Sequence, residues 1–154
     1  MKTQDISAGK AHSDFLVLPN DTNHYGNLFG GTLLALMDRT AFIAARRYSE
    51  GDLVTVSVEN VVFASPLRLG ESAVINAEVS KVGKTSVETT VNVFSGEKVV
   101  IKDAYFTFVN VDKAGKPLAV PQPEFGSPEE KARYNEHSRV RTLQKECLLK
   151  AKAI

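Results

Sequence analysis

The sequence predicts an α+β fold in which one helix is wrapped by a curved antiparallel sheet. Three observations support this fold. Residues 32–48 repeat apolar side chains at spacings of three and four, and the helix that they predict is apolar almost all round. Residues 53–111 are typical of four long strands, and apolar side chains alternate with others along all but the last of them. A second helix is expected only after a proline-spaced stretch near the C-terminus, so helices and strands are segregated along the chain.

The composition predicts one ordinary globular domain, residues 1–154. Nineteen basic and 18 acidic side chains give a formal net charge of +1, too balanced for a general nucleic-acid or membrane partner. The single cysteine, Cys147, is expected to be a small buried apolar group. The three histidines are too scattered to form a zinc site, so no metal is expected. The N-terminus lacks the apolar run of a signal peptide, which predicts a cytoplasmic protein.

The first two elements are a short strand and the central helix. An apolar run at residues 15–18 ends at Pro19 and leads into a loop, which predicts the strand. Because most faces of the helix at residues 32–48 are apolar, it should be buried in the centre of the fold. Gly51 is placed to adopt the left-handed turn that ends this helix.

The four long strands follow, with turns expected at residues 66–71 and 82–85. Three valines alternate with polar residues at the start of the first strand. Their apolar phase shifts after Asn60, which predicts a β-bulge near that residue. The last strand, residues 99–111, is rich in apolar side chains on both faces, so it is expected in the interior of the sheet.

A helical extension at about residues 127–151 is expected to close the chain. Ser127 suits the N-cap, Pro128 suits the first helical position, and two glutamates follow in the first turn. The apolar stripe of this helix is weak. It is therefore expected to pack on the outside of the domain or against a neighbouring subunit.

Asp38 is the most informative candidate for chemistry, because its helix is otherwise apolar between Leu33 and Ala45. An ionised carboxylate in apolar surroundings is costly unless it is paired or functional. One interpretation is a structural pairing with a basic or backbone group. The other interpretation is catalysis.

A second candidate site is the pair Gly30 and Gly31 at the start of the same helix. Unpaired amides and the helix dipole favour negative charge there, although a glycine pair serves a tight turn as readily as an oxyanion hole. Phe29 next to the pair is expected to be a hydrophobic anchor. Gly31 and Asp38 are seven residues apart, roughly 10 Å along one helix, so they cannot contact one carbonyl. A joint site would need the carboxylate of a second copy in a two-fold dimer.

These residues belong to a set of motifs by which the chain resembles the hot-dog acyl-CoA thioesterases. The resemblance is to the branch of bacterial short- to medium-chain and animal cytosolic acyl-CoA hydrolases, and it covers about 100 residues, from Leu16 to Val111. The motifs are residues 21–23, 26–31 and 36–38, then Val54-Thr55-Val56 with Glu59, Phe63 and Pro66, then residues 82–86, and finally residues 103–109.

The resemblance implies a hot-dog fold and hydrolysis of acyl-CoA to a free fatty acid and coenzyme A. It implies that Asp38 acts as general base or nucleophile and that Asn23 of the opposing subunit positions the reactants. The amide of Gly30 or Gly31 is then the oxyanion donor. No cofactor is implied, because coenzyme A arrives as part of the substrate. The family's assemblies imply a homo-oligomer with a catalytic dimer, built as a trimer of dimers.

Four residues are candidates for contacts with coenzyme A. Lys84, Thr85 and Ser86 match the family segment that meets its nucleotide end, where a lysine and hydroxyls suit phosphate oxygens. An ordinary polar hairpin is the alternative. Arg68 is a further candidate for the same task.

Two other functions are weighed against hydrolysis. One is a non-catalytic acyl-CoA sensor or binding module. The other is a hot-dog hydratase or dehydratase, which pairs a histidine with a carboxylate. Only His24 lies near the helix here, which disfavours the hydratase.

Overall fold

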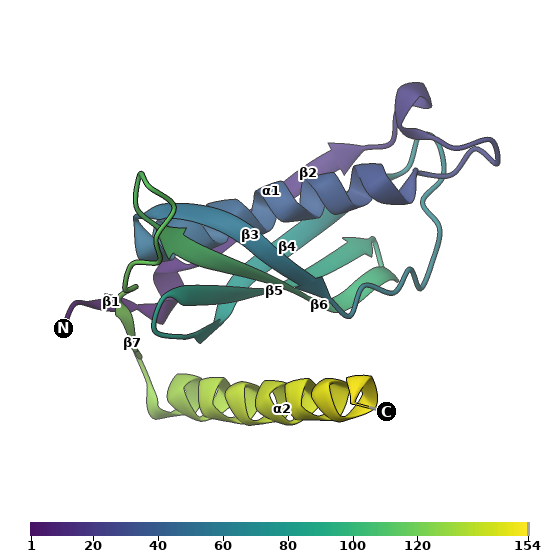
Figure 1. The fold of residues 1–154 in the computed structure, drawn as a ribbon. Helices are drawn as coiled ribbons and strands as arrows, with labels where there is room; N and C mark the ends of the chain where they lie inside the picture. The colour runs from purple at the N-terminus through teal and green to yellow at the C-terminus, as the bar shows by residue number, and fades with distance from the viewer. Residues whose placement is uncertain (154) are drawn as a thin grey trace.

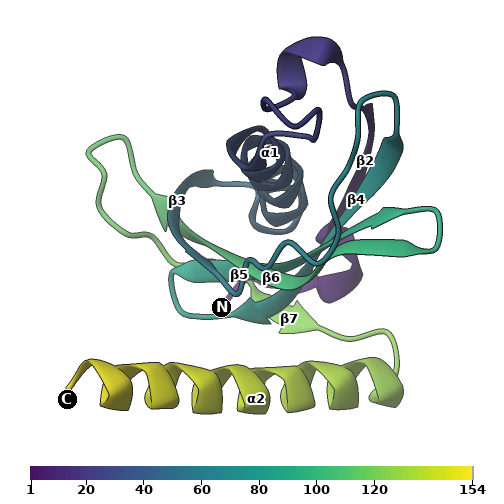
Figure 2. The same ribbon diagram turned by 90° about the vertical axis from the view of Figure 1, so that its right-hand side faces the viewer.

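The computed structural model describes residues 1–153, and its centre is a long helix, α1 (Gly30–Ser49), held in the concave face of a curved sheet (Figure 1). The sheet strands are β2 (Lys10–Leu16), β3 (Asp52–Glu59), β4 (Ser72–Val82), β5 (Ser86–Ser95) and β6 (Lys98–Val111). Their order across the sheet is β2-β4-β5-β6-β3, and every neighbouring pair is antiparallel. Figure 2, which looks nearly along α1, shows the sheet curling round the helix. The predicted α+β architecture and the interior position of the last long strand are confirmed.

The N-terminal part of the chain contains more structure than the sequence analysis predicts. Strand β2 begins at Lys10 instead of residue 15, and it is preceded by β1 (Thr3–Asp5) and a short 3-10 helix, η1 (Ile6–Ala8). Strand β1 pairs in parallel with β7 (Gln122–Glu124) in a separate two-stranded sheet. Strands of three residues are too short to produce a recognisable alternation, so their pairing is visible only in the folded chain.

The end of α1 differs from the prediction. Glu50, not Gly51, takes the left-handed conformation, with φ of 56°, and its amide donates to the carbonyl of Arg46. Gly51 is needed for another reason, because a Cβ at this position would collide with the side chain of Asn110 in β6. The requirement for glycine is therefore a close approach to a distant strand.

The predicted bulge also lies elsewhere. The register of β3 against β6 shifts between Thr55 and Ser57, so the extra residue is inside the strand. Asn60 lies just beyond the end of β3 and has φ of 58°. The change of apolar phase after Asn60 therefore marks the end of the strand instead of a bulge.

Helix α1 buries only one of its faces within a single chain. The side chains on that face pack against the concave face of the sheet, and they include Leu33, Met37, Ala41, Ala44 and Tyr48. The opposite face is open to solvent and carries the exposed apolar side chain of Ile43. The expectation of a helix buried on most sides is therefore not met by one chain alone.

The second long helix, α2 (Pro128–Lys152), crosses the convex face of the sheet (Figure 2). The predicted cap is confirmed, since the hydroxyl of Ser127 accepts a hydrogen bond of 3.1 Å from the amide of Glu130. Cys147 is exposed, so the prediction that it is buried is wrong, because α2 is covered only along the side that faces the sheet. Among residues 1–153, neither this helix nor any other is long and apolar enough to cross a membrane.

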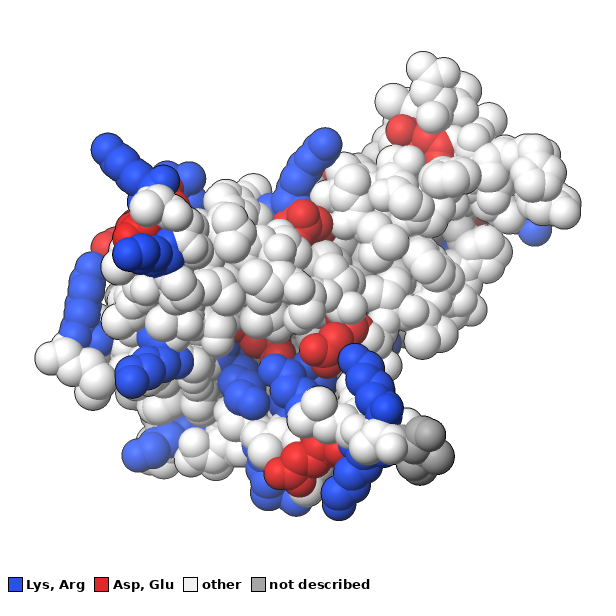
Figure 3. Space-filling view, viewed as in Figure 1, with Lys and Arg blue, Asp and Glu red and all other residues white. Residues whose placement is uncertain are grey.

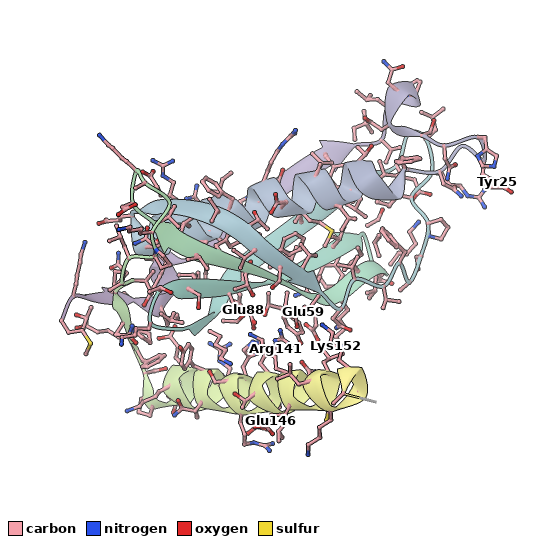
Figure 4. All side chains as sticks on the ribbon, viewed as in Figure 1. Tyr25, Glu59, Glu88, Arg141, Glu146 and Lys152 are labelled. Atoms are coloured by element: carbon pink, nitrogen blue, oxygen red, sulfur yellow. The ribbon has the colours of Figure 1, made fainter. Side chains whose placement is uncertain are left out.

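An ionic cluster between α2 and the sheet is centred on Arg141, whose side chain is only 2% exposed (Figure 4). The Arg141 guanidinium donates to both carboxylate oxygens of Glu88, at 2.9 and 3.1 Å, and to Glu59 Oε2 at 2.6 Å. It also lies 3.9 Å from the centroid of the Tyr105 ring, a cation–π contact. Lys145 Nζ lies 3.6 Å from Glu88 Oε2. This cluster connects α2 with β3, β5 and β6.

The titration of Glu88 makes this contact sensitive to acid. Burial alone would raise the pKa of Glu88, but hydrogen bonds from His137 and Arg141, with the charges of Arg141 and Lys145, lower it from 4.5 to about 2. The resulting stabilisation, about 3 kcal/mol, is fully present above the unfolded pKa. It is lost as the pH falls from about 5 towards 2.

We therefore expect the free energy of unfolding, measured by urea denaturation, to fall steeply between pH 5 and 3. The Glu88→Gln variant should be less stable at pH 7 and should show a shallower acid dependence. Equal slopes for the wild type and this variant would contradict the assignment.

Candidate active site

Asp38 lies on the side of α1 that faces β3. Its Oδ1 accepts a hydrogen bond of 2.9 Å from the hydroxyl of Thr55. No cation among residues 1–153 lies within ion-pairing distance of this carboxylate, so the alternative interpretation, a structural pairing with a basic group, is not observed. Asp38 is half-buried in the single chain, which leaves one side of the carboxylate accessible.

Thr55 is a site residue that the sequence analysis does not identify as functional. It alternates with valines on β3 and is therefore indistinguishable from an ordinary strand residue in the sequence. The register shift between Thr55 and Ser57 is a β-bulge, a device that redirects side chains and is common beside active sites. The bulge is a signal that could have identified it, but the apolar pattern of the sequence predicts a bulge near Asn60 instead.

The N-terminus of α1 presents free backbone donors. Among residues 1–153 the amides of Gly30 and Gly31 have no hydrogen-bond partner, as expected for the first turn of a helix. A Cβ added to Gly30 would lie 3.3 Å from Cζ of Phe63, and one added to Gly31 would lie 3.3 Å from Cε1 of Phe29. Phe29 is 56% exposed, so in a single chain it is not the buried anchor that was expected. The two free amides are thus flanked by two phenyl rings.

Asn23 belongs to a loop that projects beyond the N-terminal end of α1 (Figure 1). Its side-chain oxygen accepts hydrogen bonds from the amides of Tyr25, at 2.9 Å, and Asn27, at 3.2 Å. These hydrogen bonds stabilise the loop and occupy the side-chain oxygen as an acceptor. The side-chain NH2 group of Asn23 is therefore the part that is available to contact a substrate. No side-chain hydrogen bond joins Asn23 to Asp38 of its own chain among residues 1–153.

The residues proposed to contact coenzyme A lie near opposite ends of α1. Arg68 is bridged to Asn27, close to the N-terminus of α1. The turn of residues 84–86 lies near the other end, since Thr85 accepts from the amide of Asn110, the residue that meets Gly51. A 20-residue helix separates these ends by roughly 30 Å. One chain therefore does not bring the turn to the glycine amides.

The surface near Asp38 and the glycines is largely apolar. Charged side chains gather over α2 and the far end of the sheet, whereas the end that holds the N-terminus of α1 carries few (Figure 3). Exposed apolar side chains line the edge strand β3 and the segment after it: Val54, Val56, Val58, Val62 and Phe63. An open strand edge flanked by apolar side chains is typical of a protein interface. Among residues 1–153, no group of three or more His, Cys, Asp or Glu side chains converges as a metal site would.

Comparison with known proteins gives a consistent set of similarities. Residues 25–102 match the sequence model of the Thioesterase superfamily. The acyl-CoA thioester hydrolase YciA of Escherichia coli (strain K12) is 33% identical over 127 residues, which cover 77% of this chain and 96% of that protein. The solved structure of an apo-hexameric acyl-CoA thioesterase has a TM-score of 0.83 and 31% identity, covering 96% of this chain and 98% of that one.

A third relative carries information about individual residues. An acyl-CoA hydrolase from Staphylococcus aureus, solved with butyryl coenzyme A, coenzyme A and coenzyme A disulfide, has a TM-score of 0.74 and 31% identity. It covers 99% of this chain and 98% of its own. Alanine variants of that enzyme at an asparagine, an aspartate and a threonine have been solved. These three positions are separated by 15 and 17 residues, the separations that Asn23, Asp38 and Thr55 have here.

Proposed function

Because the chain belongs to the thioesterase superfamily and has its hot-dog fold, we propose that it hydrolyses acyl-CoA thioesters to a free fatty acid and coenzyme A. The observation that carries the proposal is the Asp38 carboxylate, which accepts a hydrogen bond from Thr55 and has no cation beside it in the described part of the chain. Within the same residues, the first amides of its helix have no hydrogen-bond partner. The matching separations of the three S. aureus variant positions support the same residues.

We propose that two chains share each site. Gly31 and Asp38 of one helix are roughly 10 Å apart, too far to contact one thioester carbonyl together. Pairing of β3 with its two-fold copy would cover the exposed valines of this strand and place the two α1 helices side by side. The carbonyl is then held by the glycine amides of one chain, and Asp38 comes from the other.

In the proposed reaction the thioester carbonyl oxygen accepts hydrogen bonds from the amides of Gly30 or Gly31, which stabilise the negative charge that develops on it. Asp38 takes a proton from water, and the water oxygen attacks the carbonyl carbon. The carbon–sulfur bond then breaks, and the proton passes to the sulfur of coenzyme A. In the alternative, Asp38 itself attacks and water hydrolyses the resulting anhydride. Both routes use protein groups and water, with no cofactor.

Two side chains have supporting roles in this scheme. The hydroxyl of Thr55 donates to Asp38 Oδ1 and fixes the orientation of the carboxylate, which leaves Oδ2 for the water. Asn23 of the opposing chain donates from its side-chain NH2 group and holds the thioester or the water in place.

The direct test is release of free thiol by the purified protein from saturated, branched and aromatic acyl-CoAs. Hydrolysis of at least one of these acyl-CoAs, abolished by Asp38→Ala, would support the proposal. Tight binding without turnover would instead indicate the non-catalytic acyl-CoA module.

Thr55→Val is expected to lower kcat by about 10- to 100-fold, because valine has the same shape but cannot donate the hydrogen bond to the carboxylate. Thr55→Ser keeps the hydroxyl and should retain most of the activity. Steady-state kinetics with one acyl-CoA will separate the two variants. Equal activity of the valine and serine variants would remove Thr55 from the mechanism.

The shared site predicts that two inactive variants complement each other. Asn23→Ala and Asp38→Ala should each be nearly inactive as pure proteins. Co-expressed in equal amounts, they form mixed dimers in which one of the two sites carries both changes and the other carries neither. Random assembly should restore about a quarter of the wild-type activity. A mixture no more active than its parents would show that each site uses a single chain.

We propose that these dimers assemble further as a trimer of dimers. The hexameric relative, which matches 96% of this chain, supports this state. In such an assembly the turn of Lys84, Thr85 and Ser86 would reach the site from another copy, while Arg68 lies beside the loop that carries Asn23. The phosphates of coenzyme A would then meet lysine and arginine side chains from different chains. Light scattering of the purified protein measures the assembly directly.

A further inference from the structure

The segment that leaves β3 is held at both ends. Just after the strand, Asn60 donates from its side-chain nitrogen to the carbonyl of Asp103, at 2.8 Å. Four residues later, the amide of Ala64 donates to the carbonyl of Val100, at 2.9 Å. Between these two bonds, Val62 and Phe63 are 65% and 50% exposed. The two anchors fix the backbone of a short segment that presents apolar side chains.

Phe63 reaches the N-terminus of α1 from this segment. The end of its ring lies against Gly30, with Cζ 3.3 Å from the place where a Cβ would be. Any side chain larger than hydrogen at position 30 would press on the ring. The ring is therefore next to the free amides, and half of its surface still faces solvent.

We infer that Phe63 is a specificity-determining residue, whose ring forms the wall against which the first carbons of the acyl chain pack. This inference rests on the proposed function and names its substrate class. The wall favours straight acyl chains and disfavours chains branched at the carbon next to the carbonyl.

The reason is steric. A carbonyl oxygen bonded to the glycine amides at about 2.7–3.1 Å places the next carbon of the acyl group within a few ångströms of the same amides. A straight chain can lie flat against a phenyl ring, and the apolar contact is favourable. A methyl branch at that carbon would press into the ring. Because Asn60 and Ala64 anchor the segment, the backbone at Phe63 cannot shift away from α1 without breaking a hydrogen bond.

The test compares kcat/KM for butyryl-CoA and isobutyryl-CoA, which have the same atoms and differ in the branch. For Phe63→Ala, the ratio of butyryl to isobutyryl activity should fall at least about tenfold, the usual scale for a steric contact of one methyl group. Phe63→Leu should give a smaller fall, and Phe63→Trp should raise the ratio. Val62→Ala, a change in the neighbouring and more exposed side chain, should leave it unchanged.

The outcomes separate this inference from the function on which it rests. If the wild type hydrolyses neither substrate nor any other acyl-CoA, the proposed function fails, and the inference fails with it. If the wild type is active but the leucine and tryptophan variants keep its ratio, only the inference fails. A uniform loss of activity on both substrates, without a change of ratio, would likewise show that Phe63 only supports Gly30. Circular dichroism and light scattering identify any variant that does not fold. The other two Phe63 variants then test the inference.

Discussion

Asp38→Asn is expected to lower kcat for acyl-CoA hydrolysis by about 10²- to 10⁴-fold, the usual contribution of a general base. Asparagine has the size of aspartate, and its oxygen can still accept the hydrogen bond from Thr55, so the local structure should persist. It cannot take a proton from water or attack a carbonyl. We expect KM to change little, because the variant keeps the glycine amides that hold the substrate. Stopped-flow or plate assays of thiol release measure the effect.

A matched control is Asp14→Asn, which changes an exposed aspartate on β2, at the opposite edge of the sheet from β3, and should leave kcat unchanged. If Asp38→Asn were as active as this control, hydrolysis at this site would be excluded. Hydroxylamine trapping distinguishes the two possible roles of Asp38. A nucleophile forms an acyl-aspartate that hydroxylamine converts to a hydroxamate, whereas a general base forms no covalent intermediate.

Arg141→Met is expected to lower the free energy of unfolding by about 3–5 kcal/mol, because it leaves a buried carboxylate without its main partner. Glu88 is only 3% exposed and would retain His137, at 3.4 Å, and Lys145, at 3.6 Å. Methionine fills much of the volume of arginine but cannot neutralise the charge. Urea denaturation at pH 7 measures the loss, and hydrogen exchange should show α2 opening first, because the variant loses the ionic link between this helix and the sheet.

Arg139→Met is the matched control, since it alters the same residue type one half-turn away on the same helix. Arg139 pairs with Glu136 on the exposed side of α2, where an ion pair contributes little. The double change Arg141→Met with Glu88→Leu should recover much of the lost stability, because it also removes the buried charge. If Arg141→Met were as stable as Arg139→Met, the cluster would not be what holds α2 on the sheet.

The sequence by itself determined the helices, the long strands and the fold class. Each of these depends on a repeat or a cap that is contained within a short stretch of chain: the spacing of apolar residues along α1, the alternation in β4 and β5, and the pair Ser127 and Pro128 at the start of α2. The chemistry of Asp38 and the glycine pair was also suggested locally, because a single carboxylate stands out in an apolar helix.

Only the tertiary structure decided which of these groups meet. Thr55 reaches Asp38 because the curved sheet brings β3 alongside α1, at the point where the register of β3 against β6 shifts. Neither the curvature nor the register is determined by a local sequence pattern. The same holds for Arg141, whose partner Glu88 lies 53 residues away in the chain. The open face of α1, where the exposed Ile43 lies among exposed arginines, was likewise visible only in the folded chain. Which side chains are buried depends on how the elements pack together, whereas the sequence shows only which side chains are apolar.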